Sequence, residues 1–131
     1  MHHSTELTML SCAVALGILH LVGSATFSVA SRSLTYAVGP RDEPPAPLGR
    51  MGARFERAFV NYLETFAFFA AAVLVVTVLG RSTTNSAIGS QMYVLARAAY
   101  VPAYIVGIPF IRTICWTASM IGILMVLTAC W

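Results

Sequence analysis

The stretch RFERAFVNYLETFAFFAAAVLVVTVLG, residues 54–80, decides the fold. Its second half is almost entirely apolar, whereas its first half carries charged and amide side chains. About 20 apolar residues are what an α-helix needs to cross roughly 30 Å of hydrocarbon. An ionisable residue inside such a run is costly in lipid unless it faces protein or a wet cavity. The stretch therefore predicts a transmembrane helix with one polar face turned away from lipid.

The rest of the chain has the composition of a membrane protein. Of its 131 residues, 58% are hydrophobic and only 10% are charged, whereas soluble domains carry about 25% charged residues. The apolar runs do not alternate with the period of two that a strand requires, which leaves helices as the spanning structure. We expect an all-α integral membrane protein, a four-transmembrane-helix bundle in a single domain covering residues 1–131. The predicted helices cover residues 7–31, 57–79, 88–108 and 111–130.

The charge distribution predicts the orientation in the membrane. All eight basic residues are arginine, and most of them fall at one end of the predicted bundle. A membrane segment is usually oriented with its basic flanks in the cytoplasm. We therefore expect the arginine-rich loop in the cytoplasm and both termini on the other side of the membrane, where only Arg81 flanks a helix. The arginines at the cytoplasmic end are Arg32, Arg41, Arg50, Arg54, Arg57 and Arg112.

Two polar stripes stand out on the second and third predicted helices. Arg57, Asn61 and Glu64 are spaced i, i+4 and i+7, which places them on one side of a helix, and Arg54 extends this stripe one turn outward. On the third helix, the matching stripe has the spacing i, i+3 and i+7 and consists of Arg97, Tyr100 and Tyr104. Arg97 is the natural partner for Glu64, so we expect these two side chains to pair between the helices.

The two stripes suit a small anionic ligand with several carboxylates and one amine. Arginine forks hold carboxylates bidentately, and a buried glutamate can hold an ammonium group. If the ligand carries a thiol, a nearby guanidinium or phenol can lower the thiol pKa and produce a nucleophilic thiolate. A structural role is the alternative, in which Glu64 and Arg97 pin two helices together while Arg54 and Arg57 meet lipid phosphates.

Other site types have little support in the sequence. The chain carries no Ser/His/Asp set, no Gly-rich phosphate loop, and no basic run that would indicate a nucleic-acid partner. The three cysteines have no metal-ligand spacing, so no metal is expected. His20 stands alone in the first helix, and a satisfied or lipid-interface histidine is the favoured interpretation over a ligand.

Three segments of the chain stand out together, namely RFERAFVNYLE (54–64), ARAAYVPAY (96–104) and IRT (111–113). They resemble the MAPEG superfamily, the membrane-associated proteins of eicosanoid and glutathione metabolism. The loop GPRDEPP (39–45) and the overall length resemble its bacterial members. The resemblance implies a homotrimer of four-helix bundles that binds glutathione as co-substrate between adjacent subunits, near the cytoplasmic face. Glutathione would be bound by Arg32, Arg54, Arg57, Asn61, Glu64, Arg97, Tyr100 and Tyr104. The catalytic residues would be Arg112, which stabilises the thiolate from the neighbouring subunit, and Tyr104.

The resemblance also implies an activity. We expect a membrane-bound transferase or peroxidase that uses glutathione, or a similar small thiol, on lipophilic electrophiles or lipid hydroperoxides. Thr65 and Val60 differ from the residues of the eicosanoid-forming members, which argues against that specificity. The proline that many members carry shortly after the position of Glu64 is missing here. The alternative is therefore a non-catalytic accessory subunit of a larger membrane complex, or a module that binds membrane lipids.

Overall fold

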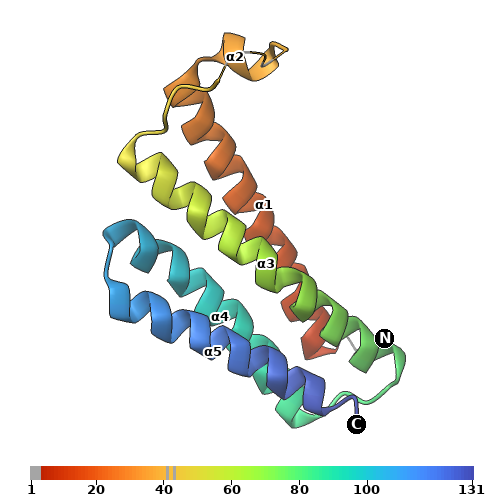
Figure 1. Cartoon of the computed structure of the whole chain (residues 1–131). Coiled ribbons are helices and arrows are strands. Elements are labelled where there is room, and N and C mark those ends of the chain that lie inside the picture. Colours follow the sequence, from red (N-terminus) through yellow and green to blue (C-terminus); the bar gives the residue numbers. More distant parts are fainter. Residues whose placement is uncertain (1–3, 41, 43) are drawn as a thin grey trace.

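The computed structural model describes residues 4–40, 42 and 44–131. All regular structure in these residues is helical, which confirms the predicted all-α class. Arg41, expected in an exposed loop, lies outside the described residues. The elements in chain order are α1 (Thr5–Arg32), the short α2 (Leu34–Val38), α3 (Arg50–Val78), α4 (Thr84–Val106) and α5 (Pro109–Thr128) (Figure 1).

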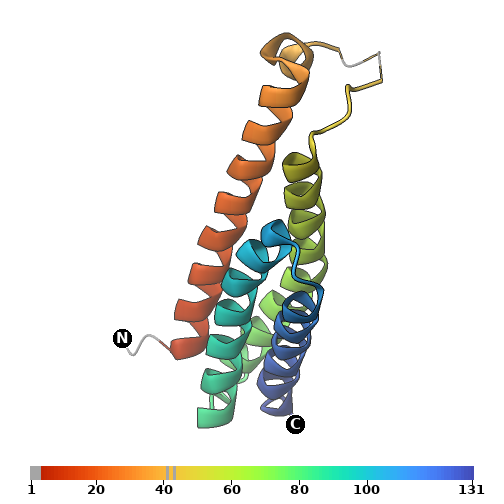
Figure 2. The same ribbon diagram turned by 90° about the vertical axis from the view of Figure 1, so that its left-hand side faces the viewer.

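The four long helices form an antiparallel bundle. Helix α1 lies beside α3, and α4 lies beside α5, with both chain termini at the same end of the bundle. Figure 2 shows that α1 and α3 extend past the junction of α4 and α5, and that α2 lies beyond the far end of α1. Away from the termini, α3 therefore passes the last turns of α4 and the first turns of α5 before it extends beyond them.

Three described helices are long and apolar enough to cross a membrane, namely α1, α3 and α5. Helix α4 has 23 residues, which correspond to about 34 Å at 1.5 Å per residue. It is not among the three because Gln91, Arg97 and three tyrosines interrupt its apolar run. The helix composition fits an integral membrane protein.

Two of the long helices begin at least one full turn before the apolar runs predicted. Helix α3 starts at Arg50 rather than near residue 57, and α4 starts at Thr84 rather than near residue 88. Apolar windows detect only the part of a helix that lies in lipid, so they miss polar turns. The start of α4 is fixed by a capping box in which the Ser86 N–H donates to Thr83 Oγ1 (3.1 Å) and the Thr83 N–H donates to Ser86 Oγ (2.8 Å).

The core lies toward the end of the bundle that holds the termini. Phe69 and Tyr93 stack there with ring centroids 3.9 Å apart, and the Tyr62 hydroxyl donates to the Ala13 carbonyl. Both tyrosines are therefore buried in the packing between helices. The buried apolar cluster consists of Ala13, Phe69, Ala72, Val73, Val76, Tyr93, Ile123 and Val126. Because the apolar contacts gather here, the polar side chains of α3, α4 and α5 are left at the opposite end.

His20 does not lie at a lipid interface, and it is not satisfied by any described residue. Its side chain is only 3% exposed and packs edge-on against three aromatic rings of α3, Phe55, Phe59 and Tyr62. Neither ring nitrogen has a hydrogen-bond partner among the described residues. The lipid-interface alternative was therefore wrong, because the side of α1 that His20 occupies packs against α3.

Replacing Ser86 with alanine is expected to destabilise the bundle by about 1–3 kcal/mol, as for other losses of a buried hydrogen-bond partner. Ser86 Oγ donates to a carboxylate oxygen of Glu6, which is 2% exposed, and so ties α1 to α4. The variant would leave this carboxylate without the bond. Detergent-solubilised protein can be compared by thermal unfolding. Ser11→Ala is the control, because Ser11 is exposed and donates only to the Leu7 carbonyl; equal stability of the two variants would contradict the prediction.

Candidate functional site

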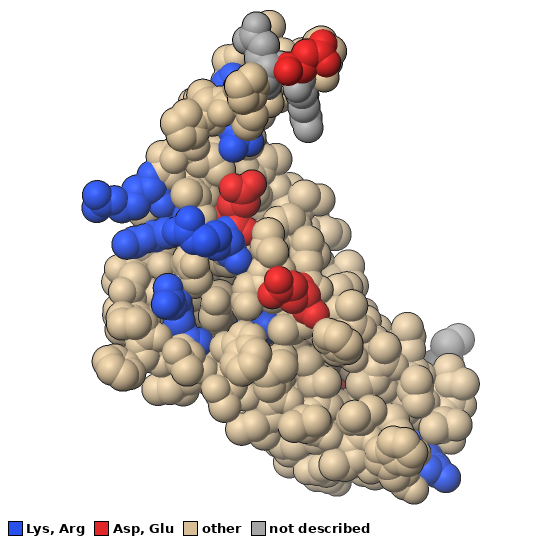
Figure 3. Space-filling view, viewed as in Figure 1, with Lys and Arg blue, Asp and Glu red and all other residues tan. Residues whose placement is uncertain are grey.

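Two adjoining pockets lie at the end of the bundle opposite the termini, with volumes of about 320 and 440 Å³. They share Asn61, Tyr100 and Tyr104, and together we call them the polar site. Figure 3 shows several arginine side chains gathered over the start of α3 and the junction of α4 with α5. The smaller pocket is also lined by Arg112, Thr113 and Trp116. The larger pocket is also lined by Glu56, Arg57, Val60 and Glu64.

The fold brings together six of the side chains that the sequence singled out. The stripe on α3 and the two tyrosines on α4 face each other across the polar site, and the first turn of α5 adds a third side. These six residues are Arg57, Asn61, Glu64, Tyr100, Tyr104 and Arg112. Within α3 and within α4, helical spacing explains why these residues lie on one side of the helix. That the six residues bind a ligand stays a prediction.

Tyr104 lies between two guanidinium groups. The Arg57 Nε–H donates to the Tyr104 hydroxyl oxygen at 3.1 Å, and the guanidinium carbon of Arg112 lies 4.7 Å from the centre of the Tyr104 ring. Because the oxygen already accepts from Arg57, the phenol can direct its own O–H toward a ligand. Neither Arg57 nor Arg112 pairs with a carboxylate among the described residues. Two guanidinium groups therefore flank a hydroxyl donor in the polar site.

Arg97 lies behind the polar site rather than in its wall. Its side chain is 1% exposed and donates from Nη1 to Asn61 Oδ1 at 2.8 Å and from Nη2 to Thr65 Oγ1. A guanidinium has donors only, so Asn61 must turn its amide oxygen toward Arg97. The Asn61 NH₂ group is then directed away from Arg97, which leaves two donors for the polar site. Arg97 can therefore influence a ligand through Asn61.

The expected pairing of Arg97 with Glu64 is wrong within the chain. At 100° per residue, Thr65 lies about 40° from Asn61 around α3, whereas Glu64 lies about 60° away on the other side. Arg97 therefore reaches Asn61 and Thr65 together, and Glu64 remains exposed in the wall of the larger pocket. No ion pair joins Glu64 to another group in the part of the chain that the structure describes.

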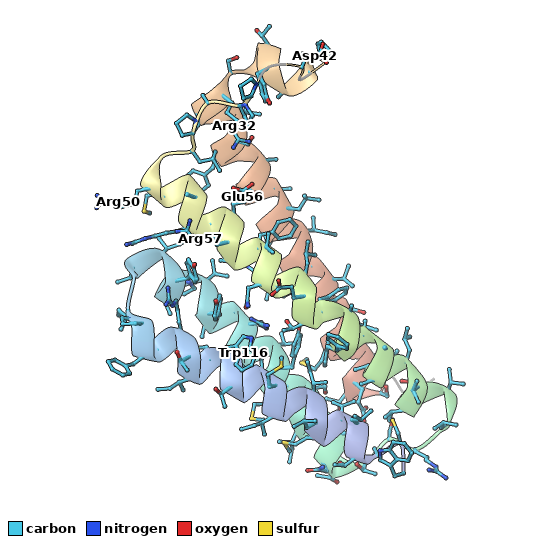
Figure 4. All side chains as sticks on the ribbon, in the orientation of Figure 1. Arg32, Asp42, Arg50, Glu56, Arg57 and Trp116 are labelled. Carbon is cyan, nitrogen blue, oxygen red and sulfur yellow. The ribbon has the colours of Figure 1, made fainter. Side chains whose placement is uncertain are left out.

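Arg54 and Arg32 lie outside the two pockets. Arg54 Nη1 donates to the Ile105 carbonyl at 2.8 Å, where a cation complements the C-terminal end of α4. Arg32 Nε donates to the Ala46 carbonyl at 2.9 Å and so holds the loop after α2. In Figure 4, Arg32 lies beside this loop, whereas Arg57 extends from α3 toward the junction of α4 and α5. Both carbonyl contacts are structural.

Several residues in or directly behind the polar site were missed by sequence reasoning. Thr65 anchors Arg97, while Thr113 and Trp116 complete the smaller pocket; Figure 4 labels Trp116 on α5. The signal was helical spacing, since Thr65 follows Asn61 by four residues and Trp116 follows Arg112 by four. A hydroxyl or indole at such a position faces lipid or packs against a helix as often as it lines a site. Spacing alone, without knowledge of the partner helix, therefore did not identify Thr65, Thr113 or Trp116.

The fold and the polar site define a class: a small all-helical integral membrane protein with a cavity near one end of its bundle that is lined by arginine, tyrosine and glutamate side chains. The model of the MAPEG family matches residues 9–131, and the chain belongs to this family. The resemblance seen in the sequence is thereby confirmed. The family includes glutathione transferases and peroxidases, and its proteins use glutathione as a substrate. No match was found among curated proteins.

Proposed function

We propose that the protein is a membrane-bound transferase or peroxidase that uses glutathione, or a similar small thiol, on lipophilic electrophiles or lipid hydroperoxides. The observation that carries the proposal is the polar site itself, in which cationic, amide, phenol and carboxylate groups line two joined pockets. Their volumes of about 320 and 440 Å³ lie in the range of small-molecule sites.

Each group in the larger pocket suits one part of a thiol tripeptide. Arg57 offers a guanidinium for a carboxylate, which charge-assisted hydrogen bonds hold firmly. Glu64 has no cation partner among the described residues and is placed to accept from an ammonium group. Asn61 presents its NH₂ donors to a carboxylate or peptide oxygen. We therefore place the anionic and amine ends of the ligand along α3.

The smaller pocket suits the thiol. The Arg112 guanidinium and the Tyr104 hydroxyl lie together there, and positive charge with a hydroxyl donor favours a thiolate over a thiol. In a transfer reaction, the thiolate sulfur forms a bond to the electrophilic carbon of the second substrate, and the leaving group takes the electron pair. In a peroxidase reaction, two thiols become a disulfide while the hydroperoxide is reduced to an alcohol and water.

A route for a lipophilic second substrate lies along the same two helices. An apolar groove of about 450 Å³ lies between α3 and α5, toward the termini from the polar site. Its apolar lining suits an acyl chain entering from the bilayer. The groove is lined by Phe68, Ala71, Ala72, Val75, Met120, Ile123, Leu124 and Leu127.

We also propose four membrane crossings and a homotrimer, with the arginine-rich loop in the cytoplasm and both termini in the periplasm of a bacterial inner membrane. The arginine distribution and the bundle support this arrangement. In the trimer, the open side of each polar site would face the neighbouring subunit, while Arg112 would act beside Tyr104 of its own chain. The exposed carboxylate of Glu64 supports a site that is open at the bundle surface.

Glu64→Gln is expected to raise the Kd for glutathione about tenfold, because the ammonium group would keep an acceptor oxygen but lose the charge that strengthens the hydrogen bond. The amplitude of the thiolate absorbance at saturating glutathione should stay near wild type, since Glu64 would hold the amine end. Stopped-flow absorbance in nanodiscs measures both quantities. Asp42→Asn is the control, because it removes a carboxylate outside both pockets. Absence of any glutathione-dependent signal in the wild type would refute the proposed function.

The apolar groove also supports the second candidate, a lipid-binding module or accessory subunit of a larger complex. Native mass spectrometry of gently solubilised protein separates the two. Retained phospholipid without glutathione, or stable co-purification with another membrane complex, would favour the second candidate. A trimer that retains glutathione would favour the enzyme.

A further inference from the structure

Thr65 on α3 places a buried hydroxyl at the boundary between the polar site and the apolar core. Its side chain is only 6% exposed. The Thr65 hydroxyl oxygen accepts from Arg97, which lies behind the pockets, and it lies 3.3 Å from the hydroxyl oxygen of Tyr93. Tyr93 in turn stacks on Phe69 in the core. One oxygen atom therefore links the core to the charged group behind the polar site.

The hydrogen bonds at this oxygen follow from its proton and its lone pairs. A threonine hydroxyl donates one proton and accepts at two lone pairs. The proton goes to the Tyr62 carbonyl at 3.1 Å, since the Asn61 carbonyl is farther away at 3.5 Å. Arg97 can only donate, so its Nη2–H occupies one lone pair, which leaves the other for the Tyr93 O–H. The Thr65 hydroxyl is thus fully bonded and held in one orientation.

We propose that Thr65 is a positioning residue of the polar site, which acts on a ligand through Arg97 and Asn61. Arg97 donates to Asn61 Oδ1 at 2.8 Å and to the Asn61 carbonyl at 3.4 Å, in addition to Thr65 Oγ1. These three hydrogen bonds fix the plane of the guanidinium against α3. Without the Thr65 acceptor, Arg97 would be held on α3 by Asn61 alone and could turn about that contact.

The orientation of Arg97 decides which face of the Asn61 amide a ligand meets. Asn61 lines both pockets of the polar site. Because its oxygen is held by Arg97, the NH₂ group is presented to the ligand, and that group selects a carboxylate or a peptide oxygen. A turned amide would present its own oxygen and repel such a group. This inference deepens the proposed function and rests on it where glutathione serves as the probe.

Two substitutions of Thr65 separate a role of the hydroxyl from a role in packing. Thr65→Val keeps nearly the same volume without the hydroxyl, whereas Thr65→Ser keeps the hydroxyl and loses a methyl group. The Kd for glutathione should rise about tenfold in Thr65→Val, as for loss of one hydrogen bond to a charged group. In Thr65→Ser it should stay within about twofold of wild type.

A packing role would reverse this order, because serine leaves a small cavity and valine does not. Wild-type affinity in Thr65→Val would overturn the proposal. A loss in Thr65→Ser as large as that in Thr65→Val would overturn it as well. Stopped-flow absorbance in nanodiscs gives the Kd of all three proteins under the same conditions.

A second measurement does not depend on glutathione. The chain contains two asparagines, Asn61 and Asn85, so ¹⁵N labelling of asparagine gives two side-chain amide groups in the NMR spectrum. Asn85 donates to Thr128 Oγ1 at 2.9 Å, away from the polar site, and is the internal control. We expect Thr65→Val to shift or split the Asn61 signals, and Thr65→Ser to leave them near their wild-type positions. Unchanged Asn61 signals in Thr65→Val would overturn the proposal even if glutathione binds normally.

The same spectrum of the wild-type protein covers the case in which Thr65→Val does not fold. An Asn61 NH₂ group that faces the open pockets should receive magnetisation from water. Absence of this transfer would overturn the assignment of the NH₂ group to the polar site, and with it the proposal. A response of Asn61 to Thr65→Val in a protein that binds no glutathione would uphold the role of Thr65 and refute the proposed function.

Discussion

Arg112→Ala is expected to abolish the thiolate absorbance of bound glutathione and to lower turnover about 100- to 1000-fold, as for loss of one electrostatic contact to a reacting anion. The Arg112 guanidinium lies 4.7 Å from the centre of the Tyr104 ring in the smaller pocket. Without it, the thiolate would keep only the Tyr104 hydroxyl and the more distant charge of Arg57. Stopped-flow absorbance and steady-state turnover with a lipophilic electrophile measure the two effects.

The affinity for glutathione separates a chemical role of Arg112 from a binding role. We expect a smaller change in Kd than in turnover, because Arg57, Asn61 and Glu64 would still hold the rest of the ligand. Arg81→Ala is the matched control, since Arg81 donates to the Cys130 carbonyl at the opposite end of the bundle. An Arg112→Ala protein that retains the full thiolate signal would show that another group stabilises the sulfur.

Gly122→Ala is expected to destabilise the bundle by about 1–3 kcal/mol, the usual cost of overpacking a closely packed contact. A Cβ atom at Gly122 would lie 2.6 Å from the Gly89 carbonyl oxygen and 2.9 Å from the Tyr93 nitrogen. Both atoms belong to the α4 backbone, so no side-chain rotation can relieve the clash. Helices α4 and α5 would have to separate, which would also disturb the stack of Tyr93 on Phe69.

Thermal unfolding of the detergent-solubilised protein measures this effect. Gly49→Ser is the control, because a Cβ atom at Gly49 would meet nothing within 4 Å and serine is a favourable residue before the first turn of a helix. This variant should be as stable as wild type or slightly more stable. If Gly122→Ala unfolds at the same temperature as Gly49→Ser, the close contact between α4 and α5 is not limiting for stability.

The part of the site that could be predicted from the sequence is the part set by helical periodicity. Arg57, Asn61 and Glu64 share a face of α3 because their spacing follows the turn of one helix, and the structure places all three beside the same pocket. The predicted start of α3 was wrong because it was taken from the apolar run alone. The polar turn that begins at Arg50 is helical without being apolar.

The sequence by itself determined that the chain is an all-helical membrane protein of the MAPEG type with polar stripes near one end. Composition and spacing are local properties, and a helix converts them directly into a buried or polar face. Only the tertiary structure decided the partners: Arg97 holds Asn61 and Thr65 instead of Glu64, Arg54 holds a carbonyl of α4, and His20 is buried against α3. Partner choice depends on how neighbouring helices are rotated and offset against each other, and that relation is set by packing between segments far apart in the chain.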